Sequence, residues 1–130
     1  MLAAIQIGTD PVLLRTRGAV LETAGLRVVS VESFVRAMEK ILTDSFDLAI
    51  LCHSLPRTDR LNFTAAIRRR HPSALVLLVS GGRGASTGEE DGMDAVLEAE
   101  PRGLLRSLRD ILRLRQKVGG AQLTEEACQA

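Results

Sequence analysis

The feature that most constrains the fold is a series of short, almost uninterrupted apolar runs separated by stretches with helical periodicity. Two of these runs, FDLAIL (46–51) and ALVLLV (74–79), show almost no alternation of polar and apolar residues. Strands that are covered on both faces have this pattern, and it is typical of the centre of a parallel sheet. Further runs at 3–7, 26–31 and 94–99 complete five expected strands. Because helical segments connect them, the sequence predicts a doubly wound parallel α/β sheet.

The connecting segments carry start and stop signals of helices. Asp10 and Pro11 are expected to be the cap and the first residue of a helix that ends near Gly25. A third helix is expected over 60–70, and a last one from Pro101. The second helix is expected to bury one apolar face made of Phe34, Val35, Met38, Ile41 and Leu42.

Length and charge narrow the class of protein. The 130 residues fit one domain, which we expect over 1–116, followed by a loose tail at 117–130 that has no apolar period. A net charge of +1 indicates neither a nucleic-acid nor a membrane partner. The sequence shows neither a membrane-spanning run nor the features of a signal peptide. Two cysteines, Cys52 and Cys128, are too few for a disulfide framework, which predicts free thiols and a cytoplasmic location.

In a doubly wound sheet, binding and catalytic sites form where the parallel strands end. The residues expected at those ends are Gly8-Thr9-Asp10, Cys52-His53-Ser54, Ser80-Gly81-Gly82 and Glu98 to Pro101. This edge is therefore the candidate site.

The order and spacing of several features resemble those of the response-regulator receiver domain of two-component, phosphorelay signalling. The resemblance covers about residues 3–115 and implies a flavodoxin-like sheet with strand order 2-1-3-4-5. Only the glycine-containing stretch 81–91 separates Ser80 from Gly92, so the fourth helix of the family is expected to be short or missing. The matching features are Asp10-Pro11, Asp47-Leu48, Pro56, Asp59, Ser80, Gly92 and Pro101.

The resemblance also implies a set of residues for phosphorylation, and this chain lacks most of them. The family uses two acidic residues that hold Mg²⁺, an aspartate nucleophile, a hydroxyl and a lysine. The corresponding positions are Gly8 and Thr9 for the acidic pair, Cys52 for the nucleophile, Ser80 for the hydroxyl, and Glu100 (or Ala99) for the lysine.

Only the hydroxyl is retained, so we expect the site to be degenerate. An aspartyl phosphate needs a hard cation and an ammonium group to neutralise its oxygens. Without them we expect no phosphotransfer, no metal, no cofactor and no enzymatic activity. Any output of a single domain would then pass through a separate protein.

The last helix offers a candidate surface for such a partner. Its arginines recur on the side opposite the leucines, and the family's switching aromatic residue in the fifth strand is replaced by a valine. The candidate surface is Val96, Arg102, Arg106, Arg109 and Arg113. We expect a signalling protein (a kinase, regulator or effector) or a second copy of the chain as partner. The alternative that these arginines are an ordinary solvent-exposed helix face without a partner remains open. Nucleic acid is disfavoured as a partner because aromatic residues are few.

Cys52 allows a different interpretation. It could be a small buried apolar residue, or a thiol redox sensor at the vacated phosphoacceptor position. We expect His53 to point to the opposite face, where it would not activate the thiol. One further alternative is that an anion binds at Ser80 and the Gly81-Gly82 amides. Another is that Cys52, His53 and His71 bind a metal ion, but their spacing is not that of a structural zinc site.

Overall fold

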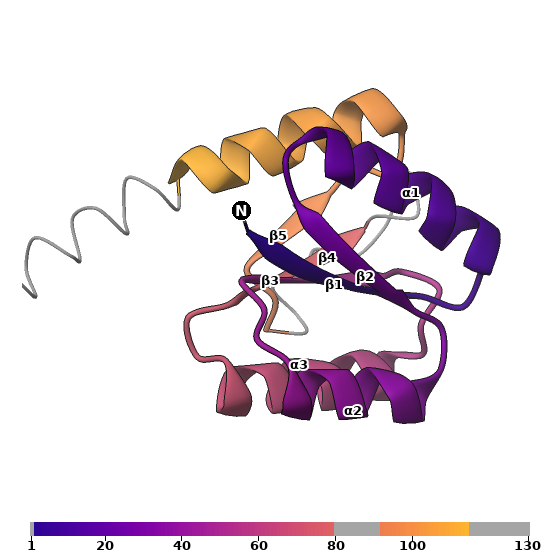
Figure 1. Cartoon of the computed structure of the whole chain (residues 1–130), viewed down its shortest axis with the longest axis vertical. Coiled ribbons are helices and arrows are strands. Elements are labelled where there is room, and N and C mark those ends of the chain that lie inside the picture. The colour runs from indigo at the N-terminus through magenta and orange to yellow at the C-terminus, as the bar shows by residue number, and fades with distance from the viewer. Residues whose placement is uncertain (1, 80–91, 115–130) are drawn as a thin grey trace, which may run out of the picture.

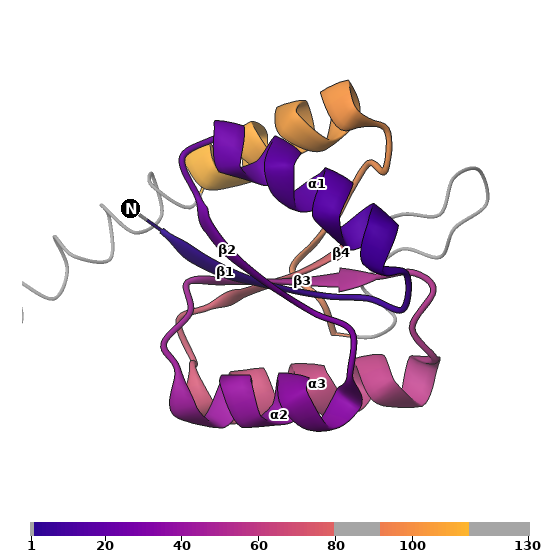
Figure 2. The ribbon, with the colours of Figure 1, turned by 45° about the vertical axis from the view of Figure 1, so that its right-hand side comes forward.

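The computed structural model describes residues 2–79 and 92–114. They form a five-stranded parallel sheet of order β2-β1-β3-β4-β5. Helix α1 and the helix over 101–114 cover one face, and α2 and α3 cover the other (Figures 1 and 2). The bounds are β1 Ala3–Ile7, α1 Pro11–Thr23, β2 Arg27–Val31, α2 Phe34–Thr43, β3 Leu48–Cys52, α3 Arg57–Arg70, β4 Leu75–Val79 and β5 Ala95–Leu97.

The two faces of the sheet bury separate apolar clusters, as the continuous apolar runs predict. On the α2/α3 face, Ile5, Leu51 and Leu78 pack with Phe63 and Ile67 of α3, among others. On the α1 face, the cluster contains Ala4, Leu21, Leu26, Leu48, Ile50, Leu77, Val79, Leu97, Leu104 and Leu108. The doubly wound fold and the strand order expected from the sequence are confirmed.

The expected ends of α1 are also confirmed. The Asp10 carboxylate accepts hydrogen bonds from the backbone N–H groups of Val12 (2.9 Å) and Leu13 (3.4 Å), and Pro11 begins the helix. Such a cap satisfies donors that have no partner within the helix. The helix ends at Thr23, and Gly25 follows with a φ of +87°, a left-handed conformation that favours glycine.

Two local expectations are wrong. The third strand, expected over 46–51, is β3 over Leu48–Cys52, and the Asp47 carboxylate just before it accepts the Ala3 N–H at 2.9 Å. The apolar face expected for α2 is turned outward in part: Phe34, Val35 and Leu42 are 41%, 63% and 52% exposed. Of the expected face, Ile41 is buried and Met38 is half-buried against the core, and Ala37 is buried as well.

The short or missing fourth helix and the tail at 117–130 lie outside the described residues. In the part of the chain that is described, no helix is long and apolar enough to cross a membrane.

Candidate functional site

The carboxyl ends of β1 and β3 meet at the expected edge, and the chain is closely packed at Gly8. Gly8 follows β1 directly, and Cys52 is the last residue of β3. A Cβ atom at Gly8 would lie 3.0 Å from Leu14 Cδ2 and 3.2 Å from Cys52 Cβ. Real Cβ contacts are rarely this short, so Leu14 of α1 fills the space that a side chain at residue 8 would need. This part of the edge is closed by packing.

Cys52 is buried within a small polar network. The residue is only 5% exposed to solvent. Arg17 of α1 points its Nη1 at the sulfur from 3.2 Å, and the Ser54 hydroxyl donates to the sulfur at 3.1 Å. Ser54 in turn shares a hydrogen bond of 2.9 Å with the Thr9 hydroxyl. Thr9 and Cys52, both expected at the site, are therefore joined through Ser54.

Arg17 is the residue of this network that the sequence analysis missed. It is 7% exposed, and it lies on the inward face of α1 together with Leu14, Gly18 and Leu21. The signal was in the sequence: residues 14, 17, 18 and 21 recur with the period of one helix face. An arginine in such a stripe needs a buried partner, and the partner here is the thiol.

The surroundings of Cys52 act on its ionisation in opposite directions. Burial raises the pKa of the thiol, whereas the hydrogen bonds from Ser54 and the hydrogen bond and charge of Arg17 lower it. The lowering effects are the larger in sum, so the pKa of Cys52 lies below its usual value. The network therefore favours the thiolate.

His53 has a smaller part in this site than Arg17. The prediction that it points away from Cys52 is wrong, because β3 ends at Cys52 and a turn begins at His53. The imidazole Nδ1 lies 3.8 Å from the sulfur, a long contact even for sulfur, and the side chain is exposed. The cation that acts on the thiol is Arg17.

Glu100, which occupies the lysine position of the resemblance, caps the helix over 101–114. Its carboxylate oxygens accept the backbone N–H groups of Arg102 (3.1 Å) and Gly103 (2.8 Å), and its carbonyl accepts the Leu104 N–H. The N–H groups of Gly103 and Arg102 hold the pKa of Glu100 below its usual value. A negative charge here is favoured by the helix end itself.

Metal ligands and the retained hydroxyl are the remaining parts of the expected site. Among residues 2–79 and 92–114, no three or more His, Cys, Asp or Glu side chains are grouped so that they could hold a metal ion. Ser80 lies outside the described residues. That the chain uses neither a metal nor a cofactor stays a prediction from the sequence.

The arginines of the last helix line a shallow groove of about 390 Å³. Arg102, Arg106, Arg109 and Arg113 are all exposed, with half-buried Leu105 and the carboxylate of Asp110 among them. Arg106 also forms an exposed ion pair with Glu98 at 3.4 Å. The groove is basic with one apolar side chain, which suits an acidic surface.

Val96 is not on the same side of the sheet as these arginines. It is half-buried and packs against the cluster of the α2/α3 face, whereas Leu104 and Leu108 anchor the last helix on the other face. The structure therefore divides the expected surface. A partner that contacts both parts has to pass around β5, which is the edge strand of the sheet.

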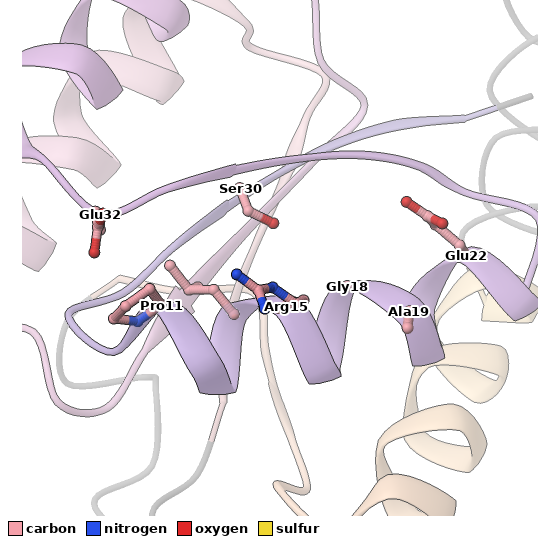
Figure 3. A pocket seen from close by; sticks show the side chains of 8 residues that line it. Pro11, Arg15, Gly18, Ala19, Glu22, Ser30 and Glu32 are labelled. Atoms are coloured by element: carbon pink, nitrogen blue, oxygen red, sulfur yellow. The ribbon is translucent and has the colours of Figure 1, made fainter.

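A second groove, of about 440 Å³, runs between α1 and β2. Figure 3 shows Glu32 beside Pro11 at one end, Glu22 at the other, and Arg15 and Ser30 between them. Its charges are of both signs, and Leu14 separates it from Gly8. Beneath it, the buried amide of Gln6 donates to the Leu14 carbonyl (2.8 Å) and the Ser30 hydroxyl (3.0 Å).

Comparison with known proteins gives the fold its class. No family model and no curated protein sequence match the chain. The solved structures that it resembles include response-regulator receiver domains, so the fold is the CheY-like, flavodoxin-like fold of that class.

Three of them illustrate the extent of the likeness. A CheY-like receiver domain protein from Methanospirillum hungatei is 21% identical with a TM-score of 0.71, covering 90% of this chain and 98% of its own. Chemotaxis response regulator CheY4 of Vibrio cholerae is 18% identical with a TM-score of 0.71, covering 85% and 98%. The receiver domain of an HD domain-containing protein from Pseudomonas fluorescens is 19% identical with a TM-score of 0.72, covering 89% and 98%. At these identities the likeness establishes the fold alone.

The close packing at Gly8 predicts that the smallest possible side chain is already too large there. We expect Gly8→Ala to lower the free energy of unfolding by about 1–3 kcal/mol, because Leu14 and Cys52 must shift. In a Leu14→Ala background the same change should cost less, since the obstructing atoms are gone. Urea unfolding of the four chains measures this coupling.

Gly18→Ala is the matched control, because its Cβ would meet nothing closer than 3.5 Å and alanine favours a helix. It should be neutral or stabilising. Equal costs of Gly8→Ala with and without Leu14 would contradict the packing argument.

The cap at Glu100 predicts a pH-dependent contribution to stability. Because the folded chain lowers this pKa, the stabilisation is complete above the ordinary glutamate pKa of about 4.3 and is lost as the pH falls through the lowered, folded value. The melting temperature of Glu100→Gln should therefore lie below that of the unchanged chain at neutral pH, and the difference should shrink in acid. Thermal unfolding followed by circular dichroism measures it. A difference that stays constant down to acid pH would refute the assignment.

Proposed function

We propose that the chain is a degenerate receiver domain that signals by binding another protein, without phosphorylation and without enzymatic activity. The observation that carries the proposal is the close packing at Gly8, where even a Cβ atom would lie 3.0 Å from Leu14 Cδ2 and 3.2 Å from Cys52 Cβ. The receiver fold supports a signalling role in general.

The chemistry of the described edge supports the loss of phosphotransfer. The phosphoacceptor position carries a thiol paired with Arg17, and the position of the counter-cation carries Glu100, whose carboxylate is engaged by the helix. Asp10 is the acidic residue that follows the two vacated positions after β1, and its carboxylate is engaged in capping α1. A hard cation such as Mg²⁺ needs several oxygen ligands at one point.

The basic groove on the last helix supports binding of an acidic partner surface. Exposed arginines attract carboxylates at long range and form paired hydrogen bonds with them on contact. Leu105 offers apolar area between the charges, as protein interfaces commonly require. The partner of this proposal is an acidic signalling protein, and self-association is the alternative that fits the same surface less well, because two basic grooves repel each other.

Absence of phosphotransfer is the first test of this proposal. After incubation with acetyl phosphate and Mg²⁺, we expect intact-protein mass spectrometry to show no phosphoryl adduct on the chain. A receiver domain that retains its aspartate serves as the positive control. We also expect no adduct in Cys52→Asp, because the nucleophile alone does not restore the metal ligands. A phosphoryl adduct on the unchanged chain would overturn the proposal.

The surface is tested by reversing its charge. We expect Arg106→Glu/Arg109→Glu to lose the proteins that the unchanged chain captures from extracts of its native cell, because the central charges of the groove change sign. The control is Arg69→Glu/Arg70→Glu, an equal charge change at exposed positions of α3.

Quantitative mass spectrometry of the captured proteins separates the outcomes. Proteins lost with the groove variant but kept with the α3 variant are partners of the proposed surface. Identical capture by the groove variant and the unchanged chain would exclude this surface.

A further inference from the structure

A buried arginine side chain lies beside Cys52. The Arg17 guanidinium is more than nine-tenths buried, with Nη1 at 3.2 Å from the sulfur. Among the residues that the structure describes, no carboxylate forms an ion pair with Arg17. Within this part of the chain, the sulfur of Cys52 is the partner of its side chain.

This pairing has an energetic consequence. A charge that leaves water loses its hydration, so an uncompensated buried ion is strongly unfavourable. A neutral thiol is a weak acceptor and compensates little of this cost. A thiolate supplies a full negative charge at contact distance. The buried guanidinium therefore points to an anion at the sulfur, independently of the cysteine itself.

We propose that Cys52 is a thiolate paired with Arg17 and that small hydroperoxides oxidise it to a sulfenate. This inference goes beyond the proposed function and does not depend on it. It assigns to Arg17 the role of positioning and charge-stabilising residue for a modification site at the vacated phosphoacceptor position.

The step balances with the hydroperoxide as the only co-reactant. The thiolate attacks one peroxide oxygen, an S–O bond forms and the O–O bond breaks. The sulfur loses two electrons, and the hydroperoxide is reduced to hydroxide or alkoxide. That base takes the proton of the nascent sulfenic acid, which leaves a sulfenate and water or an alcohol.

The contacts of Cys52 suit both the reactant and the product. Ser54 Oγ donates to the sulfur and shares a hydrogen bond with Thr9 Oγ1, and both of these residues are exposed. The sulfur is therefore one hydroxyl removed from solvent, which admits a small oxidant. Ser54 and the remaining guanidinium N–H groups of Arg17 are donors for a sulfenate oxygen.

The experiment uses the full chain with Cys128→Ser, so that Cys52 is its single cysteine. Thiolate absorbance near 240 nm is titrated in the folded chain and in the same chain in urea. Separately, hydrogen peroxide is added in the presence of dimedone, and the mass adduct at Cys52 is followed with time.

We expect the folded thiol to ionise at a lower pH than the unfolded one, and a dimedone adduct to form at Cys52. Arg17→Gln should slow adduct formation at neutral pH several-fold, because a smaller fraction of the thiol is then ionised. Arg15→Gln removes an exposed charge from the same helix and should leave the rate unchanged. Cys52→Ser should give no adduct.

Three results would overturn the inference: no adduct at Cys52, equal rates for Arg17→Gln and the unchanged residue, or ionisation of the folded thiol at the same pH as in urea or above it. The last comparison needs no substitution at Arg17, so it decides the matter even if Arg17→Gln does not fold. None of these results bears on whether the arginine groove captures a partner. The two proposals can therefore be refuted independently of each other.

Discussion

The contact of α1 with the carboxyl ends of β1 and β3 is the constraint on which the rest of the site depends. Leu14 occupies the space beside Gly8, and one turn further along the helix Arg17 reaches the sulfur of Cys52. The Asp10 cap fixes where this helix begins and hence which side chains face the edge. With α1 in this place, the edge holds the Arg17–Cys52 hydrogen bond at the position where a receiver domain holds its phosphoryl group.

The charges at the edge follow from this substitution. A phosphorylated aspartate is neutralised by external Mg²⁺ and by a lysine, so both are needed only when the phosphoryl group is present. A thiolate at Cys52 would be neutralised by Arg17 of α1, so neither Mg²⁺ nor the lysine would be needed. Glu100 then no longer needs to be a lysine, and its carboxylate stabilises the N-terminus of the last helix instead. The replacements at residues 8, 52 and 100 are consistent with a cation at residue 17.

The sequence predicts the fold well, because continuous apolar runs and caps such as Asp10 act locally. It also predicts that Gly8, Thr9 and Cys52 come together, since parallel strands end at one edge. It does not predict the Arg17–Cys52 pair, because the reach of a long side chain between two elements depends on their packing. The exposed Phe34 and Val35 were misassigned for a related reason: apolar spacing does not say which of two adjacent helix faces meets the sheet.

The helices that carry the two proposed sites are connected through one hydrophobic cluster. Leu21 of α1 packs in it with Leu104 and Leu108 of the last helix. Figure 2 shows both helices on the same face of the sheet. An oxygen added to Cys52 enters a buried environment, because the residue is only 5% exposed. Close-packed interiors respond to added volume by moving whole elements. The element next to the sulfur is α1, and its neighbour across the cluster is the helix that carries the arginine groove.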